Sequence, residues 1–184
     1  SDVCSSDLQE KGIGMIVQES GTIPNISVAE NIFLGHERLF SKGLFVDRKA
    51  MTQKAQELLD SFGISMFKAS DRTSHLDMQM RKIIEIVKCL YWNPDLLIVD
   101  ETSTALSLEG REFLYSVLDR LRKENKCVLF ISHDLSVVRY ISDRIGVMYL
   151  GNMVELADSQ ELFDRPMHPY TEALLSAIPT TNAD

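Results

Sequence analysis

Short apolar runs alternate with helical repeats along the chain. Residues 12–17, 95–100 and 127–132 are mostly apolar and too short for helices, which is typical of strands buried in a parallel sheet. Between the last two runs, apolar residues recur every three or four positions over 113–121, which predicts a helix with one buried face. Strand, helix and strand in this order form a βαβ unit with a right-handed crossover. The pattern therefore predicts an α/β fold with a parallel sheet.

More helices are predicted between the first two strands. Ser27 and Glu30 have the spacing of a capping box, in which each side chain satisfies a free amide at the helix start. Asp47 precedes a second helix with one apolar face, and apolar residues over 83–91 mark a third, which a following Asn-Pro pair ends. We therefore expect a helical subdomain, inserted at about residues 27–92.

The C-terminal part predicts a hairpin followed by two short helices. Two apolar strands flank Gly151-Asn152, a dipeptide typical of a tight turn. One helix is predicted to begin at Asp158, and Pro169 suits the first turn of another. The parallel-sheet part is expected to extend over about 93–156, with a helical extension over 157–184.

Residues 1–8 differ from the rest of the chain. They show no apolar periodicity and resemble one reading frame of a common sequencing adapter, so we expect them to be non-biological and residues 9–184 to form the domain. The sequence does not begin with Met. We expect the natural protein to continue upstream of residue 9, with a strand that lies beside the strand at 95–100.

Composition narrows the classes of function. The 184 residues are 45% hydrophobic and 25% charged, which is typical of a globular domain. A net charge of −8 argues against a nucleic-acid partner, which would require a basic face. No apolar segment approaches the roughly 20 residues needed to cross a bilayer. The three cysteines show no metal-binding spacing and indicate reduced thiols.

Polar residues stand where the predicted strands end. Asp100 and Glu101 come at the end of the strand at 95–100, and His133 follows the strand at 127–132. Because the carboxyl ends of parallel strands meet at one edge of a sheet, such residues point into its ligand crevice. The two carboxylates could hold Mg²⁺ and orient a water, and the imidazole could reach a phosphate. The alternative is that the carboxylates only cap the next helix and that the histidine is an ordinary surface residue.

The order and spacing of these residues resemble an ATP-binding-cassette (ABC) transporter ATPase over the whole chain after residue 8. The residues that carry the resemblance are Gln18, Leu76 to Met80, Leu96 to Glu101, Ser103 to Ser107, and Ser132-His133-Asp134. It implies a partial P-loop NTPase fold with a RecA-like parallel sheet, and ATP and Mg²⁺ as cofactors. It also implies that Asp100 and Gln18 bind Mg²⁺, that Glu101 polarises the attacking water, and that His133 contacts the γ-phosphate.

The family's signature motif, usually Leu-Ser-Gly-Gly-Gln, is altered here to Leu-Asp-Met-Gln-Met at 76–80. In the family these residues contact the nucleotide of a partner cassette, and Ser107 stands where the family commonly has Asp. The implied nucleotide-binding residues are therefore Leu76, Asp77, Met78, Gln79 and Ser107. The Asp77 carboxylate would stabilise its own helix but repel phosphate, so we expect poor donation to the opposite composite site. The alternative is that Asp77 is simply a helix cap.

The phosphate-binding loop is absent from the sequence, which contains no Gly-x-x-x-x-Gly-Lys-Ser/Thr. The amides and Lys of that loop (Walker A) cradle phosphates, and in the family it lies upstream of Gln18. We therefore expect a fragment that is inactive alone and binds ATP weakly or not at all.

Two parts of the chain resemble importers of different solutes. Residues 14–19 and 28–35 resemble ribose- and galactoside-type sugar importer ATPases, whereas 145–151 and 168–179 resemble the C-terminus of oligopeptide/dipeptide importer ATPases. The change falls near 131–136, and either a joined chimera or a natural hybrid explains it. The main prediction is an ATP-hydrolysing subunit of a sugar importer. The alternatives are an oligopeptide/dipeptide importer ATPase and a non-catalytic, degenerate cassette.

The same resemblance implies the partners and the location. Membrane permease subunits and a second ATP-binding cassette would bind the chain, and an extracytoplasmic solute-binding protein would act on it indirectly. The chain would lie peripherally at the cytoplasmic face of the membrane. Ile23, Ile26, Ile32 and Phe33 are candidate permease contacts, with packing inside the helical subdomain as the alternative.

Overall fold

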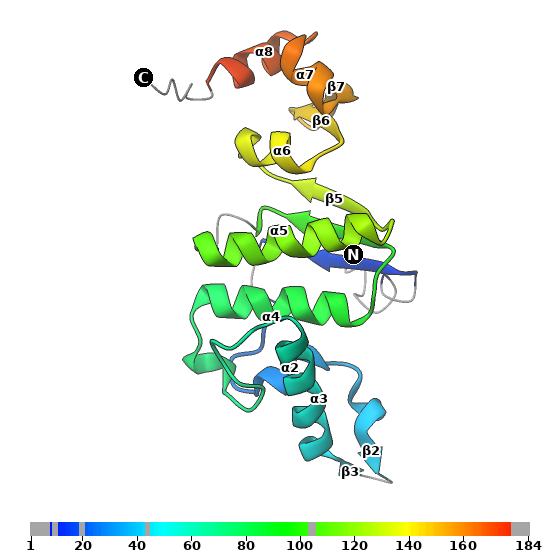
Figure 1. Cartoon of the computed structure of the whole chain (residues 1–184), viewed down its shortest axis with the longest axis vertical. Coiled ribbons are helices and arrows are strands. Elements are labelled where there is room, and N and C mark those ends of the chain that lie inside the picture. The colour runs from blue at the N-terminus through cyan, green and yellow to red at the C-terminus, as the bar shows by residue number, and fades with distance from the viewer. Residues whose placement is uncertain (1–7, 9–10, 19–20, 43–44, 103–105, 178–184) are drawn as a thin grey trace. The chain divides into compact units, whose positions relative to one another are not determined.

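The computed structural model describes residues 8, 11–18, 21–42, 45–102 and 106–177 (Figure 1). The chain forms two compact units, Ser1–Ile131 (unit 1) and Ser132–Asp184 (unit 2). Apart from Leu8, the adapter-like residues lie outside the described part.

Unit 1 holds three parallel strands, a short hairpin and four α-helices among its described residues. They are β1 (Ile13–Ile16), α2 (Val28–Ile32), β2 (Ser41–Lys42), β3 (Phe45–Val46), α3 (Arg48–Ser61), α4 (Met78–Tyr91), β4 (Leu96–Asp100), α5 (Leu108–Lys123) and β5 (Cys127–Ile131). Two 3-10 turns, Glu37–Phe40 and Thr73–His75, complete it. The hairpin and the 3-10 turns are additions to the expected elements.

The predicted parallel sheet is confirmed, with the strand order β1-β4-β5. Both pairings, β1 with β4 and β4 with β5, are parallel, with Ile16 opposite Val99 and Val99 opposite Phe130. Both edges of β4 are therefore occupied, by β1 and by β5. The expectation of a further strand beside β4 is wrong, because the short run at 13–16 takes that edge.

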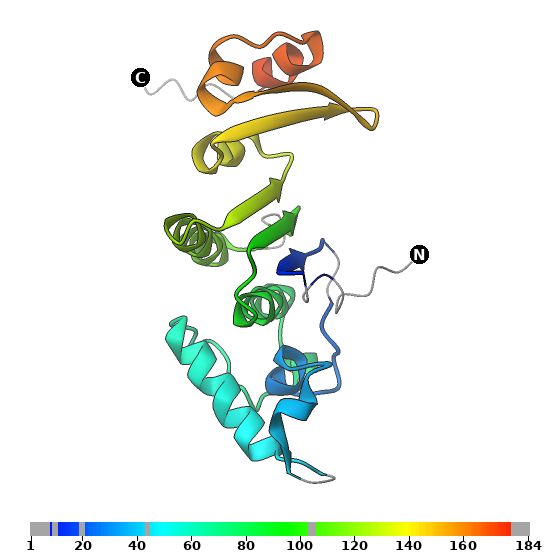
Figure 2. The same ribbon diagram turned by 90° about the vertical axis from the view of Figure 1, so that its right-hand side faces the viewer.

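Helix α4 is the centre of the core in unit 1. It contacts β1, α2, α3 and α5. Six consecutive residues in its middle, Lys82 to Val87, are all buried. Figure 2 shows α4 and α5 end-on along the same face of the sheet. Each fully buried Ile of this helix contributes about 1.5–3 kcal/mol to the free energy of unfolding through the hydrophobic effect.

The predicted capping box begins α2. The Ser27 hydroxyl accepts from the Glu30 amide at 3.2 Å, and a Glu30 carboxylate oxygen accepts from the Ser27 amide at 2.9 Å. The next residue, Asn31, is buried and joins three segments through its side-chain amide, which bonds to Thr73 Oγ1 at 2.8 Å and to both backbone groups of Ile23. These bonds fix the start of the helical subdomain.

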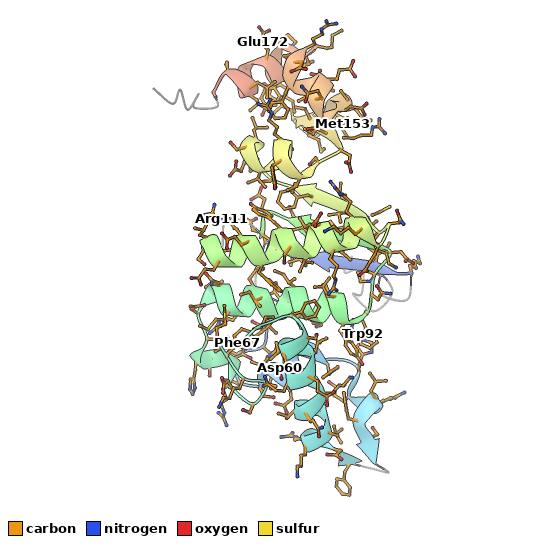
Figure 3. All side chains as sticks on the ribbon, viewed as in Figure 1. Asp60, Phe67, Trp92, Arg111, Met153 and Glu172 are labelled. Carbon is orange, nitrogen blue, oxygen red and sulfur yellow. The ribbon has the colours of Figure 1, made fainter. Side chains whose placement is uncertain are left out.

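An aromatic cluster ties residues 33–40 to the C-terminal end of α4. Phe33 meets Phe40 and Tyr91 edge to face, with ring centroids 4.7 and 5.0 Å apart. His36 lies 4.0 Å from the Trp92 ring, which Figure 3 labels at the end of α4. Because Phe33 is fully buried in this cluster, and Ile32 is fully buried too, they are core residues rather than permease contacts, which corrects that expectation. Ile23 is exposed and Ile26 is half-buried.

Unit 2 holds an antiparallel hairpin and three short helices. They are α6 (Leu135–Ile141), β6 (Arg144–Tyr149), β7 (Asn152–Asp158), α7 (Ser159–Asp164) and α8 (Pro169–Ser176). Tyr149 pairs with Asn152, so the turn residues are Leu150 and Gly151 rather than the expected Gly151-Asn152. Both have positive φ angles, 48° and 79°, as hairpin turns of this length require.

The His168-Pro169-Tyr170 run begins α8 and attaches it to the hairpin. Pro169 occupies the first turn, and His168 Nδ1 accepts from the Tyr170 amide at 3.1 Å. The Tyr170 ring lies 4.4 Å from Tyr149 at the hairpin turn. On β7, the Glu155 carboxylate accepts from the amides that precede the helix, Met167 at 2.8 Å and His168 at 3.1 Å. These contacts give each residue of the His168-Pro169-Tyr170 run a structural role at the start of α8.

The described cysteines are free thiols. Cys127 is exposed, while Cys89 is half-buried and donates its thiol hydrogen to the Met15 carbonyl at 3.3 Å. Burial raises the pKa of the Cys89 thiol to about 11, so it stays protonated near neutral pH.

Among the described residues, no helix combines the length and the apolar character needed to span a membrane.

Candidate functional site

The carboxyl end of β4 holds the two predicted acidic residues in an unusual backbone turn. Asp100 is the last residue of the strand, and Glu101 follows with φ of 45°, in the left-handed region that costs a non-glycine residue about 1 kcal/mol. The Glu101 amide donates to the Ile131 carbonyl of β5 at 3.0 Å, and the Thr102 hydroxyl donates to the Asp100 carbonyl at 3.2 Å. Thr102 is fully buried, so the fold holds this turn in place despite its strain.

Gln18 lies at the same edge of the sheet as the acidic pair. Because β1 and β4 are parallel and Ile16 pairs with Val99, residues that follow either strand emerge at one end. Gln18 is exposed, and Asp100 and Glu101 are half-buried. The edge therefore offers an amide oxygen and carboxylate oxygens close to solvent.

Oxygen donors of this kind suit Mg²⁺ better than softer metals. In the part of the chain that the structure describes, no group of three or more His, Cys, Asp or Glu side chains could hold a metal ion. Mg²⁺ commonly takes only one or two protein ligands and fills its remaining positions with water and phosphate oxygens. The donor set of Asp100 and Gln18 fits such a site.

His133 lies in unit 2, one residue before the cap of α6. It is exposed, and the following Asp134 accepts from the amides of Ser136 and Val137 at 3.0 and 3.3 Å. The Ser132 hydroxyl accepts from the Asp134 amide at 3.0 Å. Local hydrogen bonds thus fix the backbone on one side of His133, and its placement against Glu101 of unit 1 stays a prediction.

The altered signature residues lead into α4 and begin it, with Leu76 after the preceding 3-10 turn and Met78 to Met80 in the first turn of the helix. Asp77 is the cap, and its Oδ1 accepts from the Met80 amide at 2.8 Å, as the helix-cap alternative predicted. Leu76 is half-buried, while Asp77 and Met78 are exposed. A carboxylate therefore occupies the helix start that would otherwise present free amides to an anion.

Gln79 and Ser107, two predicted nucleotide-binding residues, contact one another. Gln79 Oε1 accepts from the Ser107 amide at 2.9 Å, and the Ser107 hydroxyl accepts from the Gly110 amide at 3.4 Å as the cap of α5. The bond joins the starts of α4 and α5. Residues 103–105, which the resemblance also includes, lie outside the described part.

Two buried charged residues in the middle of α4 were missed by the sequence reasoning. Lys82 and Glu85 are 1% and 8% exposed and form an ion pair of 2.7 Å. They bond to the backbone that follows β1. A signal was present, because Glu85 stands between Ile84 and Ile86 in an otherwise apolar stretch.

Two protein-family models match the sequence. The family described as "ABC transporter" matches residues 3–104, and the family described as "Oligopeptide/dipeptide transporter, C-terminal region" matches residues 154–184. The second match includes Glu155 and the His168-Pro169-Tyr170 run that attach α8 to the hairpin.

Several curated relatives are oligopeptide transport ATP-binding proteins. AppF of Bacillus subtilis is 45% identical over 130 residues, which are 70% of this chain and 40% of the relative. OppF of the same organism is 40% identical over 162 residues, 88% of this chain and 52% of the relative. AmiF of Streptococcus pneumoniae is 38% identical over 168 residues, 91% and 54%. The chain spans about half the length of the curated relatives it matches.

The main prediction of a sugar importer is wrong, because these relatives are named for oligopeptide transport. The alignments of 162 and 168 residues necessarily extend on both sides of residues 131–136, so the oligopeptide-type similarity is not confined to the C-terminal third. In the segment at 28–35 that suggested a sugar importer, Glu30 and Asn31 cap a helix and fix a loop. These are structural tasks that do not depend on the transported solute.

Solved structures share the fold. A nucleotide-free ATP-binding cassette from an ABC transporter superposes with a TM-score of 0.72 at 20% identity, covering 92% of this chain and 70% of that one. A cassette in a post-hydrolysis dimer bound to ADP and Pi gives 0.67 at 22% identity, covering 86% and 68%. Because the ABC transporter family model matches more than half of its residues, the chain belongs to the ABC transporter family of ATP-binding cassettes.

Proposed function

We propose that the chain is part of the ATP-hydrolysing subunit of an oligopeptide or dipeptide importer. The observation that carries the solute class is the match of residues 154–184 to the C-terminal region of such transporters, together with relatives named for oligopeptide transport. The hydrogen bonds of Glu155 and His168 give that region a defined structure on β7 and α8. The observation that supports hydrolysis is the strained turn at Glu101.

In this proposal the edge of the parallel sheet is the catalytic edge. Asp100 and Gln18 would hold Mg²⁺, which with bound ATP supplies charge neutralisation for the phosphates. The Glu101 carboxylate orients the attacking water and accepts its proton as the water oxygen bonds to the γ-phosphorus, while the bond from that phosphorus to the bridging oxygen breaks and ADP leaves. His133 contacts the γ-phosphate, as the family resemblance implies.

The proposed partners are membrane permease subunits and a second cassette, with an extracytoplasmic solute-binding protein acting on the chain indirectly. The chain would bind peripherally at the cytoplasmic face. Ile23 stays a candidate contact for the permease, because it is exposed and follows Gln18 by a few residues.

A second candidate function is a cassette that binds nucleotide without turnover. It is supported by the first turn of α4, where Asp77 places a carboxylate at the helix start and Gln79 is bonded to Ser107. An intact Asp100-Glu101 pair at the strand end argues for turnover.

The test is solute-dependent phosphate release by the transporter encoded by the locus that carries this sequence, reconstituted in lipid vesicles with its solute-binding protein. We expect an oligopeptide to raise the rate several-fold, and ribose or galactose to leave it unchanged. Stimulation by a sugar and not by peptides would contradict the proposed solute class. A peptide-binding transporter with no phosphate release would favour the non-catalytic cassette.

A further inference from the structure

Lys82 of α4 binds the backbone at the point where β1 ends. Its ammonium lies 2.7 Å from the Val17 carbonyl oxygen and 3.4 Å from that of Gln18. Pairing of β1 with β4 ends at Ile16, so these carbonyls lie beyond the strand ladder. A charged donor gives a stronger hydrogen bond than a neutral one, so the ammonium holds this backbone more firmly than a neutral side chain would.

Glu85, one helical turn later, binds both the Lys82 ammonium and the backbone amide of Gly21. Its Oε2 lies 2.7 Å from Lys82 Nζ, and its Oε1 accepts from the Gly21 amide at 2.5 Å. Both carboxylate oxygens thus have a partner. Among the described residues, the ammonium thus lies within hydrogen-bond distance of three oxygens, those of Val17, Gln18 and Glu85.

Attraction between the two charges does not by itself explain why this ion pair is buried. Both side chains are almost completely buried, and removing two charges from water costs more than their attraction alone usually returns. Pairs with the same i,i+3 spacing elsewhere, such as Lys54 and Glu57 on α3, are exposed and contribute little to stability. The hydrogen bonds that both side chains make to the backbone of another segment offset part of this desolvation cost.

We propose that Lys82 and Glu85 form a clamp that holds the backbone of residues 17, 18 and 21 against α4. The clamp sets the position from which the Gln18 side chain projects at the edge of the sheet. Asp77 caps the start of the same helix. The clamp therefore connects the start of α4 to the backbone of Gln18. Lys82 and Glu85 are positioning residues in this inference, which rests on the proposed function only for the role of Gln18.

The first test measures amide hydrogen exchange in the chain itself and needs no catalysis. Lys82→Met and Glu85→Leu should each speed exchange of the Gly21 amide at least tenfold, while the Ile86 amide in the middle of α4 changes less than twofold. Lys54→Met, which breaks the exposed pair of equal spacing, is the matched control and should change neither amide. Equal acceleration at Gly21 and Ile86 would overturn the proposal, because the pair would then only stabilise the helix.

A charge swap separates a clamp from a simple ion pair. The double variant Lys82→Glu, Glu85→Lys keeps opposite charges at the same spacing but places a carboxylate at the carbonyls and an ammonium at the Gly21 amide. A clamp predicts that Gly21 exchange stays at least tenfold faster in the swap. Return of Gly21 protection to that of the parent would overturn the proposal.

The functional test uses the assembled transporter. We expect Lys82→Met to lower kcat for ATP hydrolysis about tenfold and to leave KM for ATP within twofold, because Gln18 would be misplaced while the nucleotide still binds. Lys54→Met should match the parent in both. An unchanged kcat alongside fast Gly21 exchange would overturn the positioning role. If the parent releases no phosphate, the proposed function fails, while the exchange measurements still decide whether the clamp exists.

Discussion

The carboxyl end of β4 and the start of α4 both carry residues that the family uses on nucleotide, and they differ in how the fold treats them. At the strand end, Glu101 is held in a strained left-handed turn whose backbone bonds leave its carboxylate half-buried at the sheet edge. At the helix start, Asp77 and Gln79 bond to backbone amides of the protein itself.

The difference shows that a fold can leave the residues at one part of a site available for ligand while the residues at another part form hydrogen bonds within the protein. Strain at Glu101 costs stability and persists because Thr102 and β5 fix the turn around it. The bonds of Asp77 stabilise α4 instead, since a carboxylate caps the helix and lies at the positive end of its dipole. We infer that the chain's own catalytic edge is intact and that its contribution to a partner's site is reduced.

The largest effect is expected at the strand end. Glu101→Gln should lower phosphate release by the assembled transporter at least about a hundredfold, because a neutral amide cannot accept a proton from water. Glu109→Gln, at an exposed position on α5, is the matched control and should hydrolyse ATP at the parent rate. Equal rates for Glu101→Gln and the parent would favour the non-catalytic cassette.

The helix start is tested by two substitutions of one residue. Asp77→Ala should lower the free energy of unfolding by about 1 kcal/mol in urea titration, because the Met80 amide loses its cap. Asp77→Ser keeps a capping oxygen without the charge and should unfold within about 0.5 kcal/mol of the parent. In the assembled transporter we expect Asp77→Ser to raise ATP turnover. Lower turnover in Asp77→Ser would show that the carboxylate does not oppose nucleotide.

Backbone strain at the strand end gives a smaller effect. Glu101→Gly should raise the free energy of unfolding by up to about 1 kcal/mol, because glycine adopts a positive φ without steric cost. Leu150→Gly, at φ of 48° in the hairpin turn, should stabilise to a similar extent. Only the first variant should lose hydrolysis. A loss of stability in Glu101→Gly would mean that side-chain contacts, rather than function, account for glutamate at this position.

Glu155 in unit 2 is, like Asp77, a carboxylate that accepts hydrogen bonds from backbone amides of the protein itself. The Thr171 side chain and the amides of Met167 and His168 lower the pKa of the Glu155 carboxyl below its ordinary 4.5. Its contribution to stability is therefore present above about pH 4.5 and lost as the pH falls through the lowered pKa.

Hydrogen exchange gives the measurement for Glu155. Protection of the Met167 and His168 amides should fall two- to fivefold as the carboxyl is protonated, which corresponds to about 0.5–1 kcal/mol for a half-buried anion near a helix start. Glu155→Gln should lack this decrease. The same decrease in the variant would assign it to another group and contradict the prediction.

The sequence predicts the three strands well, but it does not predict contacts between residues that are far apart along the chain. The runs at β1, β4 and β5 are apolar and short, so their identity as strands follows from local pattern, whereas the position of β1 beside β4 does not. The bond from Gln79 to Ser107 and the clamp of Lys82 and Glu85 join residues that are far apart along the chain, and no local period encodes them. The hairpin turn was misplaced by one residue because Leu150 adopts a positive φ that favours other residue types.

The solute was misassigned for a related reason. The sugar-type segment at 28–35 contains residues that fix a helix start, and such residues report on the scaffold rather than on what is transported. The C-terminal network of Glu155 and the His-Pro-Tyr run was the better guide, because it lies in the region that matches oligopeptide/dipeptide transporters.

The central claim is that Glu101 at the strand end performs hydrolysis. It is tested most directly by identifying the nucleotide retained by the Glu101→Gln transporter after it is mixed with ATP and separated from free nucleotide. The account predicts ATP on the variant and ADP on the parent treated in the same way. Recovery of ADP from the variant at the parent's rate would show that hydrolysis proceeds without this carboxylate and would contradict the account.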